Sequence, residues 1–303
     1  MMTEQNHKIE KIFDEWKVAI IIASIGRRNE IEQLLPHLFS QTLPPWKVIL
    51  SVEKNDDIPD GIPSAVEIIK GPRGLTAQRN RGLESVINNC DVIVFYDDDF
   101  IPARNSIAEI VKIFEKYPEI VASTGLVLAD GVKKGGIEYD VSVDIVNNQS
   151  ISNPPENIRD IDSLYGCNMA LRAKAVGAIR FDETLPLYGW QEDVDFAGQL
   201  LVKGRIVSAD TFQGVHRGVN KGRTPGAKLG YAQVVNPLYL FKKGTMRWKK
   251  ALILVLKNII ANHMRLIWEE PFIDRRGRAK GNWIGLWHIL TGSSDPRRIN
   301  QIK

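Results

Sequence analysis

Apolar and polar residues alternate in blocks along the first part of the chain, through residue 128. Short apolar runs with the length of strands occur at 17–24, 46–52, 66–69, 91–96 and 120–128. Between them, apolar residues recur at intervals of three and four, as in helices that bury one face, at 30–40, 76–87 and 107–117. Because strands that alternate with helices form layered domains, the pattern predicts an α/β fold with a mostly parallel central sheet flanked by helices.

The pattern changes after residue 128. Segment 129–160 is rich in Gly, Asn, Asp and Pro, which predicts a long loop or a hairpin. Two further strands and one helix are expected at 168–172, 205–209 and 193–203. Beyond Gly222 the chain becomes helical and basic, with helices expected at 229–241 and 248–267 and a flexible basic loop at 275–278.

The formal net charge of +4 conceals two regions of opposite charge. Residues 1–220 contain 23 Lys and Arg against 32 Asp and Glu, a balance of −9, whereas residues 221–303 contain 17 against 4, a balance of +13. We therefore expect three parts: a polar tail at 1–16, a catalytic domain at 17–220 and a basic helical C-terminal extension at 221–303.

Features that direct a chain to a membrane or out of the cell are not visible. The polar residues 1–16 lack the apolar core of a secretory signal, and no window has the ~18 uncharged apolar residues of a spanning helix. Two cysteines, Cys90 and Cys167, exclude a disulfide scaffold and suit a reducing compartment. The expected location is the cytoplasm.

Informative polar residues follow the predicted strands. Ligands of open α/β sheets bind at the carboxyl ends of strands, where Ser24 and Arg27 follow the first strand, Glu53 the second and Asp97–Asp99 the fourth. The first and last of these aspartates lie on one side of an extended chain, and two such carboxylates suit a hard divalent ion, Mn²⁺ or Mg²⁺. The alternative is a solvated acidic turn, although adjacent carboxylates repel one another.

Three other segments carry candidate chemistry. Residues 71–82 form a Gly/Pro turn that leads into a basic helix start, which suits a phosphate or a ribose, although an ordinary surface helix has the same pattern. Asp193 lies at the start of a helix, where it is either an N-cap or a carboxylate base. His216 follows the last short strand and is either structural or a ligand of a metal or diphosphate.

Five of these pieces occur in the order and at the spacing of one enzyme family: the turn at 24–28, Glu53, the Arg79 helix, a DxD motif at 97–99 and an ED motif at 192–193. The set resembles glycosyltransferase family 2, whose members have the GT-A fold. The resemblance covers about residues 17–220. It implies the following roles: Ser24, Arg27, Glu53, Arg79, Asp97 and Asp98 bind the nucleotide sugar; Asp97, Asp99 and His216 hold the metal; Trp190 and Glu192 contact the sugar or the acceptor; Asp193 is the catalytic base.

The same resemblance implies a reaction. A sugar moves, with inversion, from a nucleoside-diphosphate sugar to an acceptor hydroxyl, and a UDP-sugar is favoured because the family residue that matches Glu53 often contacts uracil. Sugars or lipid-linked sugars are the expected acceptors, in bacterial polysaccharide or glycolipid assembly. Processive members carry a QxxRW motif, whereas this chain has Arg247-Trp248 with Gly244 at the glutamine position, which favours single-sugar transfer.

The basic extension has two open interpretations. Apolar residues at helical spacing in 248–268, flanked by lysines, suit a helix packed on the catalytic domain or one attached to an anionic membrane face. The second would place the protein on the inner face of the cell membrane as a peripheral protein. A nucleic-acid partner is not expected, because no binding motif accompanies the charge.

Other functions lack their expected sequence features. A sugar-phosphate nucleotidyltransferase should have a Gly-rich loop after the first strand, where this chain has SIGRRN. A dehydrogenase should have GxGxxG there, and a phosphoribosyltransferase should follow its strand-end acids with a Thr-Gly loop. A catalytically silent, membrane-docked assembly subunit would not need Asp97, Asp99 and Asp193 together.

Overall fold

The computed structural model describes residues 16–150, 156–219, 224–266, 270 and 272–302, so the predicted polar tail lies, apart from its last residue, outside them. Within these residues nine strands form one sheet in the order β3-β2-β1-β4-β8-β6-β9-β5, with β7 paired to β9. The strands are β1 (Val18–Ala23), β2 (Lys47–Val52), β3 (Val66–Lys70), β4 (Val92–Asp97), β5 (Phe100–Pro102), β6 (Ile120–Asp130), β7 (Ile158–Asp160), β8 (Asn168–Arg172) and β9 (Arg205–His216). Strands β8, β5 and β7 run opposite to the other six, so the predicted mostly parallel sheet is confirmed.

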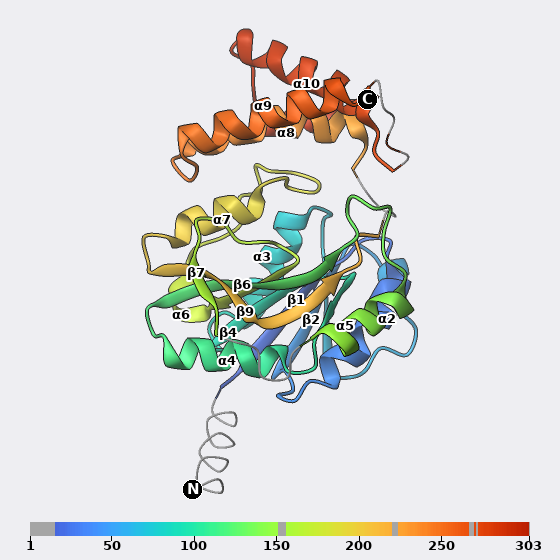
Figure 1. Ribbon diagram of the computed structural model, residues 1–303, viewed down its shortest axis with the longest axis vertical. Coiled ribbons are helices and arrows are strands. Elements are labelled where there is room, and N and C mark those ends of the chain that lie inside the picture. The colour runs from blue at the N-terminus through green and yellow to red at the C-terminus, as the bar shows by residue number, and fades with distance from the viewer. Residues whose placement is uncertain (1–15, 151–155, 220–223, 267–269, 271, 303) are drawn as a thin grey trace, which may run out of the picture.

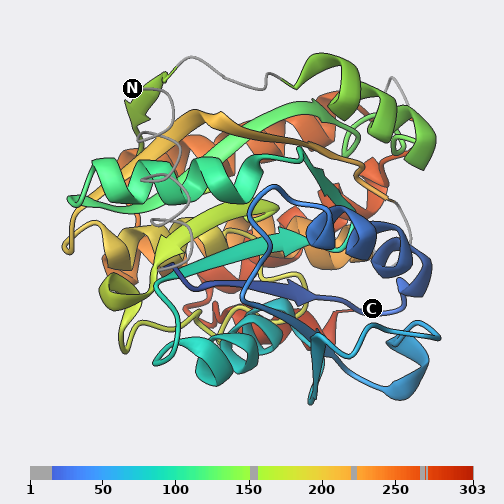
Figure 2. The same cartoon turned by 90° about the horizontal axis from the view of Figure 1, so that it is seen from below.

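Helices cover both faces of the sheet (Figure 2). They are α2 (Arg28–Phe39) and α4 (Ser106–Lys116) on one face, and α3 (Leu75–Val86), α6 (Ala173–Val176) and α7 (Glu192–Leu200) on the other. Strand β1 is covered on both sides, since Ile20 and Ile22 belong to the first layer and Ile21 to the second. This double burial explains why β1 is an uninterrupted apolar run rather than an alternating one.

Parallel pairing brings the carboxyl ends of β1, β2 and β4 together. Ala23 of β1 lies opposite Ser51 of β2 and Asp97 of β4. The side-chain amide of Gln78, on α3, donates to the carbonyl oxygens of Ser24 (2.9 Å) and Ser51 (2.8 Å), which holds the two strand ends in place. The polar residues that follow these strands therefore share one edge of the sheet.

Segment 129–160 differs from its sequence-based prediction. Instead of a long loop or a hairpin, its described part contains the helix α5 (Tyr139–Gln149) and the short strand β7. Only Ser142 and Val146 of α5 are buried, and its valines and asparagines are weak helix formers. Packing against β5, β6 and β9 stabilises this helix, which local propensity could not predict.

Strand β9 is also longer than predicted. It continues beyond Ala209 to His216, where the sequence turns polar and the apolar pattern ends. The polar half of the strand is buried because it pairs with β6 on one side and β5 on the other. Gly214 allows the close approach to β5, since a Cβ atom there would lie 2.3 Å from the ring of Phe100. His216 is therefore the last residue of a long strand rather than part of a loop.

Three helices and a 3₁₀ turn form the C-terminal extension: α8 (Gly226–Lys243), α9 (Trp248–Met264), α10 (Arg275–Leu290) and η2 (Pro296–Gln301). Figure 1 shows the helices as a separate layer on one side of the α/β body. Apolar clusters connect the layer to the body, and one of them joins Leu185 and Val194 to Leu240 on α8. In the described part of the chain, no helix is long and apolar enough to cross a membrane.

The prediction of a flexible loop at 275–278 is wrong. These residues form the first turn of α10, and the Asp274 side chain caps it by accepting a hydrogen bond from the Gly277 amide (2.7 Å). Gly277, Gly281 and Gly285 are spaced four residues apart, so they lie on one side of α10. A Cβ atom on Gly281 would lie 2.0 Å from the carbonyl oxygen of Ala227 on α8. The glycines thus permit close helix packing rather than flexibility.

Candidate active site

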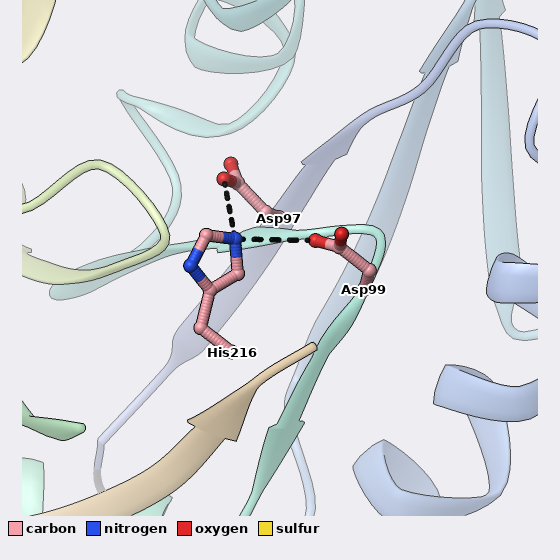
Figure 3. A group of neighbouring side chains, drawn as sticks. All are labelled: Asp97, Asp99 and His216. Carbon is pink, nitrogen blue, oxygen red and sulfur yellow. Dashed lines mark ion pairs between the residues drawn. The ribbon is translucent and has the colours of Figure 1, made fainter. Parts of the chain in front are cut away.

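Two carboxylates and one imidazole converge at the carboxyl edge of the sheet (Figure 3). His216 Nε2 lies 3.4 Å from Asp99 Oδ1 and 3.8 Å from Asp97 Oδ2, and one ligand atom from each of the three residues lies within 4.8 Å of the others. Asp99 Oδ1 is buried and accepts no hydrogen bond among the described residues. An orphaned carboxylate oxygen beside an imidazole nitrogen suits a divalent cation, so these residues fit the predicted metal.

The other ring nitrogen of His216 is held by residues that the sequence did not indicate. Its Nδ1 lies 3.3 Å from both Asp130 Oδ1 and the Tyr165 hydroxyl, and this hydroxyl donates to Asp130 Oδ2 (2.6 Å). Such partners fix the tautomer and orientation of metal-ligating histidines. Asp130 ends β6, so the rule that ligands gather at strand ends could have found it.

Charge and burial act in opposite directions on Asp99. Burial alone would raise the pKa of this carboxyl, but the neighbouring His216 and then Arg27 lower it to about 2. The pKa of His216 is in turn well above its ordinary value: burial opposes this shift, and Asp130 and Asp99 are among the groups that cause it. The site therefore has a strong preference for positive charge between its carboxylates.

The middle aspartate of the motif connects the first strand to the site. Asp98 is buried, and its two oxygens accept hydrogen bonds from the Ser24 hydroxyl (2.5 Å) and the Arg27 guanidinium (2.8 Å). Burial raises the pKa of Asp98 to about 7, although Arg27 opposes the shift. Arg27 also donates to the carbonyl oxygen of Val219 (2.9 Å) and lies 3.4 Å from Asp99. Ser24, Arg27 and the motif thus form one connected group, as the prediction of a shared edge requires.

Arg79 joins the DxD and ED motifs. Its guanidinium is almost completely buried, 2 % exposed, and donates to Glu192 Oε1 (2.5 Å), Asp97 Oδ1 (3.1 Å) and the carbonyl oxygen of Gly166 (2.8 Å). Burial would lower the pKa of Arg79, but the two carboxylates outweigh it and raise the pKa. Burial raises the pKa of Glu192, and Arg79 opposes this shift. Two motifs that are far apart in the sequence are therefore held at a fixed distance by one side chain.

Asp193 begins α7 together with Glu192. The N-cap residue is Gln191, so the interpretation of Asp193 as an N-cap is wrong. Its carboxylate accepts hydrogen bonds from the backbone amides of Gly166 (3.1 Å) and Val194 (2.8 Å). Burial nevertheless raises the pKa of Asp193, and the charge of Arg79 acts against it. A half-buried carboxylate with a raised pKa is suited to accept a proton.

The backbone before α7 is strained. Leu187 and Gln191 have φ angles of 61° and 74°, in the left-handed region that side chains disfavour. Between them Tyr188 is 55 % exposed and lines all three cavities described below. Strained residues persist where surrounding packing imposes them, and they cluster at functional sites. No sequence pattern assigns a role to Tyr188, because an exposed tyrosine in a loop is ordinary.

Three cavities surround these side chains. The first, of about 440 Å³, lies over the ends of β1 and β4 and is lined by Ser24, Arg27, Asp97 and Asp98. The second, of about 490 Å³, contains the metal-site residues and is closed by α9 and α10. The third, of about 550 Å³, is lined by the predicted contact residues Trp190 and Glu192 and by Asp193, together with Lys250 and Leu254 of α9.

Glu53 is a predicted site residue that lies outside the three cavities. It follows β2 at the same edge of the sheet but lines none of the three cavities. Asp57, which the sequence analysis passed over, is buried nearby and accepts hydrogen bonds from the amides of Gly26 (2.7 Å) and Lys54 (3.1 Å). Asp57 therefore shapes the loop that carries Arg27.

The model of "Glycosyl transferase family 2" matches residues 19–172, just over half of the chain. No curated protein matches. Among solved structures, a crystal structure of S. aureus TarS aligns with 86 % of this chain and 44 % of that chain, at 12 % sequence identity and a TM-score of 0.48. This chain thus spans less than half of the TarS chain. By the match of its residues 19–172, the chain belongs to glycosyl transferase family 2.

Proposed function

We propose that this glycosyltransferase moves one sugar from a nucleoside-diphosphate sugar to an acceptor hydroxyl with inversion of configuration. The observation that carries the proposal is the bridge made by Arg79. It joins Asp97 of the metal-site cluster to Glu192, the neighbour of Asp193. A cation site for a diphosphate and a carboxylate base are thereby held side by side, which is what displacement at an anomeric carbon requires.

The cavity over β1 and β4 is the proposed site of the nucleotide. Ser24, Arg27 and Asp98 line it, and so do two further cations, Arg73 and Lys228. Asp97, Asp99 and His216 would hold Mn²⁺ or Mg²⁺ at its border with the second cavity. The chemistry that such an ion supplies when bound is neutralisation of the negative charge on the diphosphate. We favour UDP as the nucleotide and expect Glu53 to face the base from the rim.

The chain's own residues perform the transfer in one displacement. Asp193 accepts the proton of the acceptor hydroxyl as its oxygen bonds to the anomeric carbon, and the bond from that carbon to the diphosphate breaks with its electron pair on the phosphate oxygen. Attack from the opposite face inverts the configuration. Arg79 holds Glu192 and Asp97 in position throughout. A general base of this kind contributes about 10²–10⁴-fold in rate.

The cavity beside Asp193 is the proposed acceptor site. Trp190 offers an aromatic surface to a sugar ring, and Glu192 lines the same cavity. We propose a sugar or a lipid-linked sugar as the acceptor, in bacterial polysaccharide or glycolipid assembly. The basic extension would then attach the enzyme to the inner face of the cell membrane, and no nucleic acid takes part.

A ligand screen tests the proposal directly. Thermal unfolding is followed with a panel of nucleoside diphosphates and nucleotide sugars, each with and without Mn²⁺. We expect a UDP-sugar to raise the unfolding temperature only when Mn²⁺ is present, and slow hydrolysis of the same compound to follow. Release of pyrophosphate from a nucleoside triphosphate and a sugar phosphate would instead identify a nucleotidyltransferase. Binding without any hydrolysis or transfer would identify a silent subunit.

A further inference from the structure

One side of α9 exposes a row of large apolar side chains. Its members are Trp248, Leu252, Leu256, Ile260 and Met264, spaced four residues apart, and each is between 45 % and 59 % exposed. Successive members of the row are neighbours on the helix surface, and the row turns around the helix by about 40° at each step. The packed side of α9 is different, because Ala251 and Val255 are buried there. The sequence left two alternatives for this helix, packing on the catalytic domain or attachment to a membrane. In the structure the buried side and the exposed row are different faces of α9.

Helix α10 continues this apolar surface. Trp283 and Trp287 are 64 % and 65 % exposed, and Leu290 is 81 % exposed. The two helices are neighbours at this point, since the rings of His263 on α9 and Trp283 on α10 lie 5.7 Å apart. We call the combined surface the α9–α10 face: the α9 row with Trp283, Trp287 and Leu290. Folded proteins seldom expose so large an apolar surface without a partner.

Basic side chains accompany the apolar ones. Lys249 on α9 and Arg276 and Lys280 on α10 are exposed. Neither helix contains an aspartate or a glutamate. A second copy docked on the same face would bring cations against cations, because a twofold dimer pairs identical surfaces. A partner with dispersed negative charge and an apolar interior is complementary to both properties.

We propose that the α9–α10 face binds the surface of a membrane leaflet that contains anionic headgroups. Apolar side chains enter the boundary between headgroups and acyl chains, and the cations contact the lipid phosphates. The tryptophans sit at the depth that their amphipathic rings prefer. The helices lie in the plane of the leaflet and do not cross it.

The opposite row of α9 connects this docking to the reaction. Lys250 and Leu254 line the cavity beside Asp193, whereas Asn258, Ala261 and Arg265 line the metal-site cavity. One helix, about 10–12 Å across, therefore separates the leaflet from both cavities. Resting on the proposed function, this arrangement gives a lipid-linked acceptor a short path from the leaflet to Asp193. The docking itself does not depend on that function.

Co-sedimentation with vesicles tests the docking without donor or acceptor. The full chain is mixed with vesicles of phosphatidylcholine alone and with vesicles that also contain phosphatidylglycerol. We expect tighter binding to the anionic vesicles, and weaker binding as salt is raised. The double variant Trp283→Ser/Trp287→Ser should lose about tenfold or more in affinity for them. The double variant Lys249→Glu/Lys280→Glu should lose about fivefold or more for each lysine, and only for anionic vesicles.

A tryptophan elsewhere supplies the matched control. Trp46, just before β2, is 42 % exposed, and Trp46→Ser should bind vesicles like the unaltered chain. Absence of binding to both kinds of vesicle would overturn the proposal, as would equal binding by the double tryptophan variant. A dimer that dissociates on Trp283→Ser/Trp287→Ser, seen by sedimentation velocity without vesicle binding, would assign the face to a second copy instead. Hydrolysis of a nucleotide sugar without vesicles is measured in parallel, so failure of the docking and failure of the transferase function are separate results.

Discussion

The carboxyl edge of the sheet and the α9–α10 face use charge in opposite ways. At the sheet edge, Arg79, Asp98 and Asp99 are buried with opposite charges as partners. On the α9–α10 face, Lys249 and Lys280 are exposed and accompany apolar side chains. Burial makes an unpaired charge costly, so each charge in the first region needs an opposite charge within the protein. The exposed cations of the second region are instead complementary to a partner outside the protein. The comparison distinguishes residues that build a site from residues that attract a partner.

The largest expected effect is at the proposed base. Asp193→Asn keeps the shape of the side chain but cannot take a proton, so we expect kcat for transfer to fall by about 10²–10⁴-fold. Binding of the nucleotide with Mn²⁺, followed by calorimetry, should remain. Asp195→Asn is the control, because Asp195 is bonded to Lys243 and Thr245 and should affect stability rather than kcat. Turnover close to that of the unaltered enzyme in Asp193→Asn would exclude this residue as the base.

The next largest effect is on stability, where replacing a buried arginine should cost more than replacing an exposed one. Arg79→Gln leaves two carboxylates without their cation in a buried site, and we expect it to lower the free energy of unfolding by about 3–5 kcal/mol. Arg265→Gln removes an ion pair with Glu270 from a half-exposed position, where about 0–1 kcal/mol is expected. Urea denaturation of both variants measures the difference. Equal losses in the free energy of unfolding would mean that the buried network contributes no more to stability than an exposed ion pair does.

Asp130 tests whether residues outside the motifs tune the metal site. Asp130→Asn weakens the group that orients His216, so affinity for Mn²⁺ should fall by about 10–100-fold. Calorimetric titration of Mn²⁺ in the presence of the nucleotide measures this. Asp144→Asn, at an exposed position on α5, should leave the affinity unchanged. If Asp130→Asn binds Mn²⁺ like the unaltered enzyme, His216 does not need that carboxylate.

The sheet-edge site was largely predictable because its parts are local in sequence. An apolar run ended by Asp97–Asp99 indicates both the strand and the candidate metal ligands, and the fixed geometry of parallel strands places Ser24 beside them. Asp130, Tyr165 and Tyr188 were not predicted. Their roles arise from contacts with residues far away in the chain, and no short pattern encodes such contacts.

The extension was predicted less well for a related reason. Segment 275–278 predicts a loop when it is taken alone, yet Gly277, together with Gly281 and Gly285, lets α10 lie against α8. The apolar residues of α9 fit a helix at once, but periodicity does not say which of two apolar sides meets the body. Only the packed structure separates Ala251, which is buried, from Leu252, which is exposed.

The acid limb of the pH profile sharpens the role of Asp193. Burial raises the pKa of this carboxyl above the ordinary value of 3.8. A base must be ionised, so kcat should fall as pH drops through the raised pKa, by about tenfold for each pH unit below it. Saturating Mn²⁺ is needed, because His216 must lose its proton to bind metal. A kcat that stays constant down to pH 3.8 would contradict the assignment.

The smallest expected effect lies where the two regions meet. Lys257 is on α9 and lines the metal-site cavity, and no described residue forms an ion pair with it. If the extension helps to hold the diphosphate, Lys257→Gln should weaken binding of UDP with Mn²⁺ by about two- to fivefold, the range for an exposed charge. Raised salt should reduce the difference because it screens exposed charges. Lys242→Gln, exposed in the last turn of α8 and outside the three cavities, removes the same charge at a distance. Equal weakening by the two variants would mean that only the overall positive field of the extension matters, and no weakening by Lys257→Gln would mean that α9 does not contact the donor.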